Sequence, residues 1–246
     1  MIINNSTLTK KAFNLKNVQY LYNNYIYDGD SYVNYGKKLL FQDGIEIRDS
    51  IEKCINEDNG DIHIDVEKLK KLYFPKIKAD IFLSHSHKDI ELVNFFVGYM
   101  QNHFKKKVFV DSNVWGNVYE LRKNLYDDYA QIPGKIGSYY LNKSDKISDN
   151  LNIILASSLT EMIKNTNTFL FLSTDNSIND EYILNSPWIY HEIVTLNCFP
   201  IAKGKISAHD SKSVTESAMI FDYNIESYIK NLRTLDVTEN GWENKL

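Results

Sequence analysis

From residue 79 onward, short apolar runs alternate with longer stretches whose apolar positions recur at helical spacing. The runs at 79–84, 107–111 and 168–174 have the length and the β-branched and aromatic content of buried strands. Residues 86–100 and 151–164 instead repeat apolar side chains every three or four positions, which is typical of helices that cover a sheet. This alternation predicts an α/β fold with a central parallel sheet flanked by helices.

The chain after the third apolar run carries a helix start. Ser186 is a favourable N-cap, and Pro187 suits the first helical position, where its missing N–H costs nothing. Trp188 and Glu192 are four residues apart, so they share one face of the predicted helix. This stretch therefore predicts a helix that presents an aromatic ring and a carboxylate side by side.

Residues 1–77 lack the strand and helix alternation and predict a mostly helical accessory segment. Apolar positions across 45–55 repeat at helical spacing. Tyrosines crowd residues 20–35, and such a cluster is more often part of a core than a binding site. We therefore expect a main domain at 78–246 that follows a separate segment.

An insert of about 112–148 separates the second and third predicted strands. It is too long for an ordinary connection, so it predicts either a lid or a small inserted subdomain. The tail of the chain predicts a weak strand at 218–223, a short helix at 225–233 and a last strand at 234–238.

Composition narrows the class of protein. With 43% hydrophobic and 24% charged residues among 246, the chain has the balance of a folded globular protein. A formal net charge of -4 gives no support to nucleic acid as a partner. Two cysteines far apart, no apparent signal peptide and no long apolar stretch favour a soluble protein of the reducing cytoplasm without a membrane partner.

Candidate chemistry gathers where the predicted strands end. Ser84, His85 and Ser86 follow the first strand, Asp111 follows the second, and the loop after the third leads to Glu192. In an open parallel sheet, ligands bind beyond the carboxyl ends of the strands. We therefore expect these side chains to border one site.

The two histidines of this segment allow a second interpretation. His85, His87 and Asp89 form a His-x-His-x-Asp pattern that resembles the metal-binding start of metallo-beta-lactamase-fold hydrolases. That fold expects another histidine where this chain has Ile90. No phosphate-binding loop and no serine nucleophile elbow is apparent in the sequence.

Four segments taken together resemble a Toll/interleukin-1 receptor (TIR) domain. They are DIFLSHSHKD, VFVDS, TFLFLST and SPWIYHE. Ser186, Trp188 and Glu192 match the family pattern Ser-x-Trp-x-x-x-Glu at every position. The resemblance covers about residues 79–240 and implies a flavodoxin-like TIR fold, although the long insert departs from the family's usual short loop.

The resemblance also implies an activity. Many bacterial members are NAD hydrolases or cyclases, and the role of their essential carboxylate falls on Glu192. Trp188 is then expected to line the pocket, and Ser84, His85 and Ser86 to lie beside the substrate. The segment after Asp111 is expected to close over that substrate. Standalone TIR proteins of Thoeris-type antiphage defence are similar, and there the product activates a separate effector.

NAD cleavage is compatible with a single carboxylate and needs no metal or added cofactor. Nicotinamide leaves as a neutral ring without a proton, so one preorganised carboxylate is enough to stabilise the oxocarbenium-like cation. Trp115 or Trp188 is a candidate to stack on a flat ring of NAD, and Asp111 is either a substrate contact or the cap of a turn. Two alternatives stay open: a TIR scaffold that acts by self-association without catalysis, and a metal-dependent hydrolase that uses His85 and His87.

Overall fold

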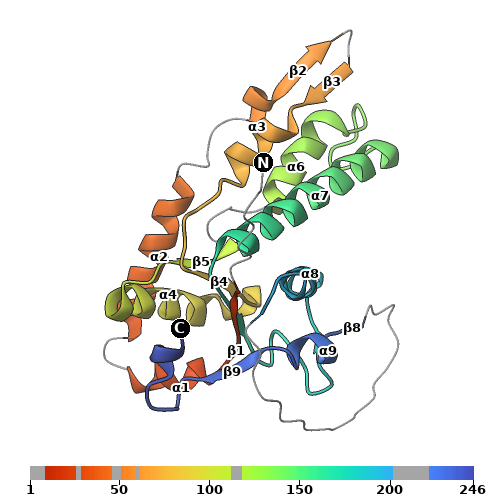
Figure 1. The fold of residues 1–246 in the computed structure, drawn as a ribbon. Coiled ribbons are helices and arrows are strands. Elements are labelled where there is room, and N and C mark those ends of the chain that lie inside the picture. Colours follow the sequence, from red (N-terminus) through yellow and green to blue (C-terminus); the bar gives the residue numbers. More distant parts are fainter. Residues whose placement is uncertain (1–8, 26–28, 46–50, 59–60, 112–117, 202–221) are drawn as a thin grey trace, which may run out of the picture. The chain divides into compact units, whose positions relative to one another are not determined.

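The computed structural model describes residues 9–25, 29–45, 51–58, 61–111, 118–201 and 222–246 (Figure 1). The chain divides into two compact units. Residues 1–39, 78–110 and 162–246 form the first, called the sheet unit below. Residues 40–77 and 111–161 form the second, called the insert unit.

The sheet unit is built on five parallel strands. Their order across the sheet is β5-β4-β6-β1-β9, with bounds Val108–Phe109 (β5), Ile81–Ser84 (β4), Thr168–Leu172 (β6), Lys11–Lys16 (β1) and Arg233–Asp236 (β9). Residues of β4 and β6 are buried throughout, as expected for a parallel sheet covered on both faces. The predicted α/β fold with a central parallel sheet flanked by helices is confirmed, and the arrangement is compatible with a flavodoxin-like fold.

β1 is the main correction to the sequence prediction. Residues 1–77 are not a helical segment outside the sheet, because Lys11–Lys16 pairs with β6 on one side and β9 on the other. The flavodoxin-like strand order is 2-1-3-4-5, and β1 occupies its fourth position. The sequence signal is weak because lysine, alanine and asparagine are all depleted in strands.

A buried lysine holds the start of β1 in place. The Lys10 Nζ donates hydrogen bonds to the carbonyl oxygens of Lys164 at 2.9 Å and Thr166 at 2.7 Å. Burial lowers the pKa of Lys10 below its ordinary value. The lysine thereby satisfies carbonyl groups at the end of the helix that precedes β6.

Right-handed crossovers place the covering helices on two faces of the sheet. The chain moves from β4 to β5 through α4 (Ile90–Phe104) toward one edge, and from β6 to β9 through α8 (Pro187–Asn197) and α9 (Glu226–Ile229) toward the other. Opposite directions require opposite faces. Figure 1 shows α4 on one side of the sheet and α8 and α9 on the other. The helix α1 (Val18–Asn24) packs against α4. The sheet unit also contains two 3-10 helices, η2 (His87–Asp89) and η3 (Trp242–Lys245).

The tyrosine-rich segment agrees only in part with the expected core, because Tyr20 and Tyr35 are exposed while three other tyrosines pack against a buried ring. Tyr22, Tyr25 and Tyr32 meet Phe95 of α4 with ring centroids 5.0, 6.4 and 5.9 Å apart. The helix α2 (Gly29–Ile45) crosses α4 closely, since a Cβ on Gly98 would lie 2.1 Å from the Tyr32 carbonyl oxygen. Only glycine permits this backbone approach.

The tail agrees in part with its prediction. The strand expected at 218–223 lies mostly outside the described residues, and β8 (Tyr223–Asn224) pairs antiparallel with β7 (Ile183–Leu184). The expected helix and last strand correspond to α9 and β9.

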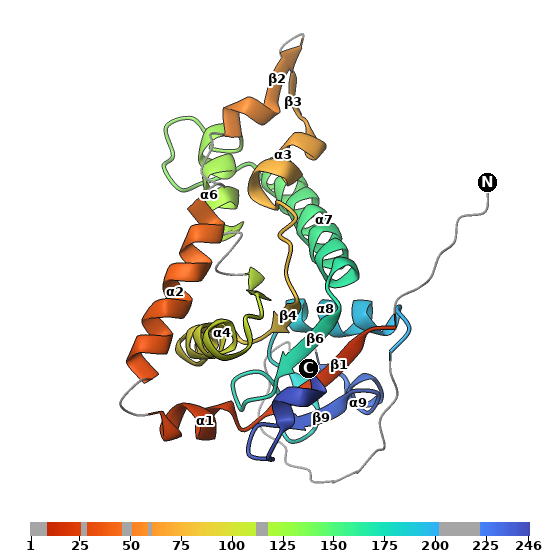
Figure 2. The same ribbon diagram turned by 60° about the vertical axis from the view of Figure 1, so that its left-hand side comes forward.

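The insert unit combines a hairpin with helices. Its elements are η1 (Ile51–Cys54), β2 (Ile55–Asp58), β3 (Asp61–Ile64), α3 (Val66–Tyr73), α6 (Val118–Tyr129) and most of α7 (Leu141–Asn165), shown from a second side in Figure 2. Residues 46–50 of the helix expected over 45–55 lie outside the described residues, and the prediction is wrong at its end, because Ile55 begins β2 and pairs with Ile64. The predicted helix at 151–164 begins ten residues earlier, at Leu141. The described part of the insert thus consists of two helical stretches joined by a turn at 130–140, and it belongs to a compact subdomain.

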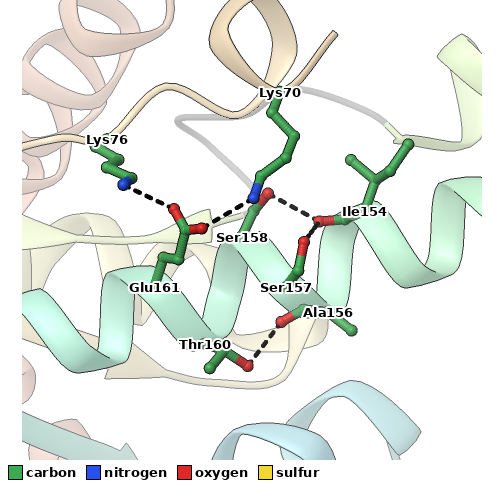
Figure 3. Close-up of polar contacts among 8 residues, drawn as sticks. All are labelled: Lys70, Lys76, Ile154, Ala156, Ser157, Ser158, Thr160 and Glu161. Atoms are coloured by element: carbon green, nitrogen blue, oxygen red, sulfur yellow. Dashed lines mark hydrogen bonds and ion pairs between the residues drawn. The ribbon is translucent and has the colours of Figure 1, made fainter. Parts of the chain in front are cut away.

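Glu161 ties α3 and the segment after it to α7. Its two carboxylate oxygens each lie 2.9 Å from a lysine Nζ, one of Lys70 and one of Lys76 (Figure 3). The hydrogen bond from Lys70, followed by that from Lys76, lowers the pKa of Glu161. On the same helix, the hydroxyls of Ser157 and Ser158 both donate to the Ile154 carbonyl, so these polar groups are satisfied within α7.

Candidate functional site at the carboxyl end of the sheet

β4 ends in a buried polar turn. The Ser84 side chain is 1% exposed, and its Oγ is a buried atom without a hydrogen-bond partner among the described residues. His85 is also buried, with Nδ1 3.3 Å from the Leu83 carbonyl oxygen, and its ring stacks on His87 at 5.9 Å between centroids. A buried hydroxyl without a partner costs about 1–3 kcal/mol, so its retention favours a functional role for this turn.

Asp89 performs a task that the sequence pattern did not reveal. Ser86 and Asp89 have the spacing of a capping box, but it is Ser86 Oγ that caps η2, by accepting from the Lys88 N–H at 3.4 Å. The Asp89 carboxylate instead accepts hydrogen bonds from Thr174 Oγ1 at 2.6 Å and Asn176 Nδ2 at 2.7 Å. It therefore joins the loop after β4 to the loop after β6.

α8 carries the predicted carboxylate. Ser186 is the N-cap, with its Oγ 3.3 Å from the Trp188 N–H, and Pro187 begins the helix as predicted. Glu192 is 3% exposed and lies on the buried stripe of α8 with Ile189 and Ile193. A nearly fully buried glutamate is uncommon, because its charge must be paired or put to use.

The other predicted site residues divide as follows. Trp188 is half-buried, and its ring meets His191 edge-on at 6.5 Å. Asp111 is half-buried but belongs to the insert unit rather than to the sheet unit. Trp115 lies outside the described residues. The sheet unit thus contains Ser84, His85, Ser86, Trp188 and Glu192, but not Asp111.

The position of β1 creates a second switch point beside β6. The crossover after β6 runs toward the β9 edge, whereas the crossovers after β4 and β1 both run toward the β5 edge. After β6 the chain therefore crosses one face of the sheet, whereas after β4 and after β1 it crosses the other face. This difference places a switch point on each side of β6. In a flavodoxin-like sheet, the strand at the fourth position follows the third strand along the chain, and the sheet then has a single switch point.

A polar cavity of about 480 Å³ lies at this second switch point. Asn14, Lys16 and Asn17 line it from the end of β1, and Thr174 and Asp175 line it from the end of β6. Its amide, hydroxyl and carboxylate groups suit a ligand rich in hydroxyls.

Neighbouring contacts hold this cavity in shape. Asn17 adopts the left-handed conformation, with φ 63°, and its Nδ2 donates to Asp236 Oδ2 at 2.8 Å. Burial would raise the pKa of Asp236, but hydrogen bonds from Asn17 and Thr238 outweigh it and lower that pKa.

The two switch points share a row of the sheet. Ser84 of β4 and Asn14 of β1 both pair with Phe171 of β6, so the three side chains project from the same face. Asn14 Oδ1, like Ser84 Oγ, is buried without a hydrogen-bond partner among the described residues. Two polar oxygens with unused bonding capacity therefore flank Phe171 at the carboxyl end of the sheet.

The part of the chain that the structure describes contains neither a candidate metal centre nor a candidate membrane span. Across the described ranges, no group of three or more His, Cys, Asp and Glu side chains is arranged to hold a metal ion. None of the helices in those ranges is both long and apolar enough to cross a bilayer.

No protein-family model matches the chain, and neither the curated proteins nor the solved structures compared with it give a match.

Proposed function

We propose that the chain is a TIR-type enzyme that cleaves the nicotinamide–ribose bond of NAD, with Glu192 as the essential carboxylate. The observation that carries this proposal is the burial of Glu192, at 3% exposure, on the helix that follows β6 at a switch point of a parallel sheet. Ser84 lies at the end of the neighbouring strand, and its hydroxyl has no partner among the described residues, which supports the same location.

The chemistry assigns separate tasks to these residues. Glu192 stabilises the positive charge that develops on the ribose as neutral nicotinamide departs, an effect that is strong because the surroundings are poor in water. Ser84 is available to hydrogen-bond a hydroxyl of the substrate. Asp89 positions the two loops that border the site through its bonds to Thr174 and Asn176. The resulting ADP-ribose group passes to water or to a nucleophile within the same molecule, which gives ADP-ribose or a cyclic product.

In a cell, we propose that this product is a signal of antiphage defence. The enzyme would work in the cytoplasm, self-associate through its TIR domain and activate a separate effector through its product. These roles follow from the resemblance of the SPWIYHE segment and its companions to signal-producing TIR proteins.

The direct experiment follows nicotinamide release from NAD by chromatography with mass spectrometry. Glu192→Gln is expected to lower turnover by about a hundredfold to a thousandfold, since it removes one preorganised electrostatic contact. Glu120→Gln, an exposed glutamate of α6, is the matched control and is expected to retain full activity. Circular dichroism confirms that both variants fold.

Two outcomes contradict the proposal. Full activity in Glu192→Gln removes this carboxylate from the mechanism. Absence of nicotinamide release by the wild type, even at concentrations that promote self-association, favours the non-catalytic scaffold instead. A stoichiometric zinc content in the purified protein would support the metal-dependent alternative with His85 and His87.

A further inference from the structure

The insert unit contains a cavity of its own, of about 460 Å³. Leu69 of α3, Leu125 of α6 and Leu151 of α7 line it, and each of them is at most 2% exposed. Ile62 and Val66 also line it and are 45% and 42% exposed. The cavity thus has an apolar interior and an apolar rim open to solvent, with a volume typical of small-molecule sites.

Polar ties between its walls form the cavity in advance of any ligand. Glu161 holds α3 to α7 through Lys70, as Figure 3 shows. The hydroxyls of Tyr126 on α6 and Ser148 on α7 are hydrogen-bonded to each other. Asp65 caps α3 by accepting from the Lys68 N–H at 3.0 Å. A preformed cavity spares a ligand the entropic cost of ordering its site.

Charge is segregated on α7 in a way that favours an anion. Lys143 and Lys146 line the cavity on the same stripe as Ile147, Leu151 and Ile154. The acidic residues nearest in sequence, Asp145 and Asp149, do not line the cavity, although Asp149 is only three residues from Lys146. The wall of the cavity therefore receives two positive charges from α7 and no negative one.

These lysines are not neutralised by the protein. Within the ranges that the structure describes, neither Lys143 nor Lys146 takes part in an ion pair, and the Lys143 Nζ lies 5.5 Å from the centroid of the Tyr140 ring. His63 of β3 adds a third nitrogen-bearing side chain to the lining. An anionic group beside an apolar body complements both features at once.

We propose that the insert unit binds a small amphipathic anion, with its apolar body inside the cavity and its carboxylate, sulfonate or phosphate at Lys143 and Lys146. A medium-chain fatty acid has this chemistry. The site uses none of the residues assigned to NAD cleavage, so it goes beyond the proposed function and stands without it.

The test uses the full chain and the fluorescent probe 8-anilinonaphthalene-1-sulfonate, with dodecanoate as competitor. We expect saturable binding of the probe and its displacement by dodecanoate. The double variant Lys143→Ala/Lys146→Ala is expected to weaken binding about tenfold or more, because it removes the charge-assisted contacts. Lys123→Ala, an exposed lysine of α6 outside the cavity, is the matched control and should bind as the wild type does.

A second pair of variants tests the apolar part without relying on charge. Ile147→Trp fills the cavity and is expected to abolish binding, whereas Ile153→Trp, at a position of α7 that is 68% exposed, leaves it unchanged. Near-ultraviolet circular dichroism verifies native packing in each variant, which distinguishes loss of the site from loss of the fold.

Three results would overturn the proposal. They are equal probe binding in all five proteins, equal displacement by dodecanol and dodecanoate, and sedimentation with anionic phospholipid vesicles without any binding of monomeric dodecanoate. The last result would assign the lysines to a membrane surface instead. Since Glu192→Gln is expected to bind the probe normally, failure of this proposal and failure of the proposed enzyme activity are separable.

Discussion

In the sheet unit, polar side chains are buried at the ends of strands and on a covering helix, whereas the insert unit leaves large apolar side chains exposed. Ser84, Asp89 and Glu192 are each at most 8% exposed. In the insert unit, Ile136 is 96% exposed and Leu141 is 74% exposed. Burying polar groups lowers the stability of the fold, and exposing large apolar groups lowers solubility. Each feature therefore indicates a different kind of function.

The two units are therefore suited to different interactions. Buried polar groups with few degrees of freedom are what transition-state stabilisation requires, because donors and charges must be in place before the reaction. An apolar cavity with lysines at its wall is suited to holding a ligand without changing it. We therefore expect substitutions in the two units to separate the proposed catalysis from the proposed ligand binding.

Among the substitutions that probe stability, one at the tightly packed contact between α2 and α4 is expected to be the most destabilising. Gly98→Ala places a Cβ 2.1 Å from the Tyr32 carbonyl oxygen, so α2 and α4 must move apart. We expect a loss of about 2–3 kcal/mol in the free energy of unfolding, measured by urea denaturation. Ile147→Phe in the insert unit adds more side-chain volume than Gly98→Ala, but the added ring extends into a cavity. We expect this substitution to lower the free energy of unfolding by less than about 1 kcal/mol. Equal costs would erase this contrast between the units.

A smaller effect is expected where Asp89 joins two loops of the sheet unit. Asp89→Ala removes two charge-assisted hydrogen bonds and leaves Thr174 and Asn176 without this acceptor. We expect the free energy of unfolding to fall by about 2 kcal/mol. Asp175→Ala, at an exposed position of the same loop, should change it by less than about 0.5 kcal/mol. If the two variants are equally stable, Asp89 does not hold the loops.

The smallest effect concerns pH and the insert unit. The folded pKa of Glu161 lies below its ordinary value of 4.5, so its ion pairs stabilise the protein above that value and are lost as pH falls through the lowered pKa. Because the side chain is 36% exposed, Glu161→Gln should cost no more than about 1 kcal/mol at neutral pH.

The pH profile is the check on this prediction. The stability difference between Glu161→Gln and the wild type should shrink as the pH falls below 4.5 through the lowered pKa of Glu161. A difference that does not depend on pH would mean that packing, rather than charge, ties α3 to α7.

Elements with strong local signals were predictable. β4 and β6 correspond to short apolar runs, and the start of α8 is indicated by Ser186 and Pro187. The candidate residues Ser84 and Glu192 were found for the same reason, since both belong to short segments with a recognisable pattern. The tie made by Asp89 was missed, because its partners lie 85 and 87 residues away and no local pattern marks them.

The amino-acid sequence by itself determined the alternation of strands and helices, and with it the parallel sheet and the edge where chemistry is expected. Only the tertiary structure decided that Lys11–Lys16 fills the fourth position of the sheet and that Glu192 is buried. It also joined residues 40–77 and 111–161 into one unit around a cavity. The physical reason is that strand order, burial and cavities arise from contacts between distant segments, whereas periodicity and helix caps are properties of neighbouring residues.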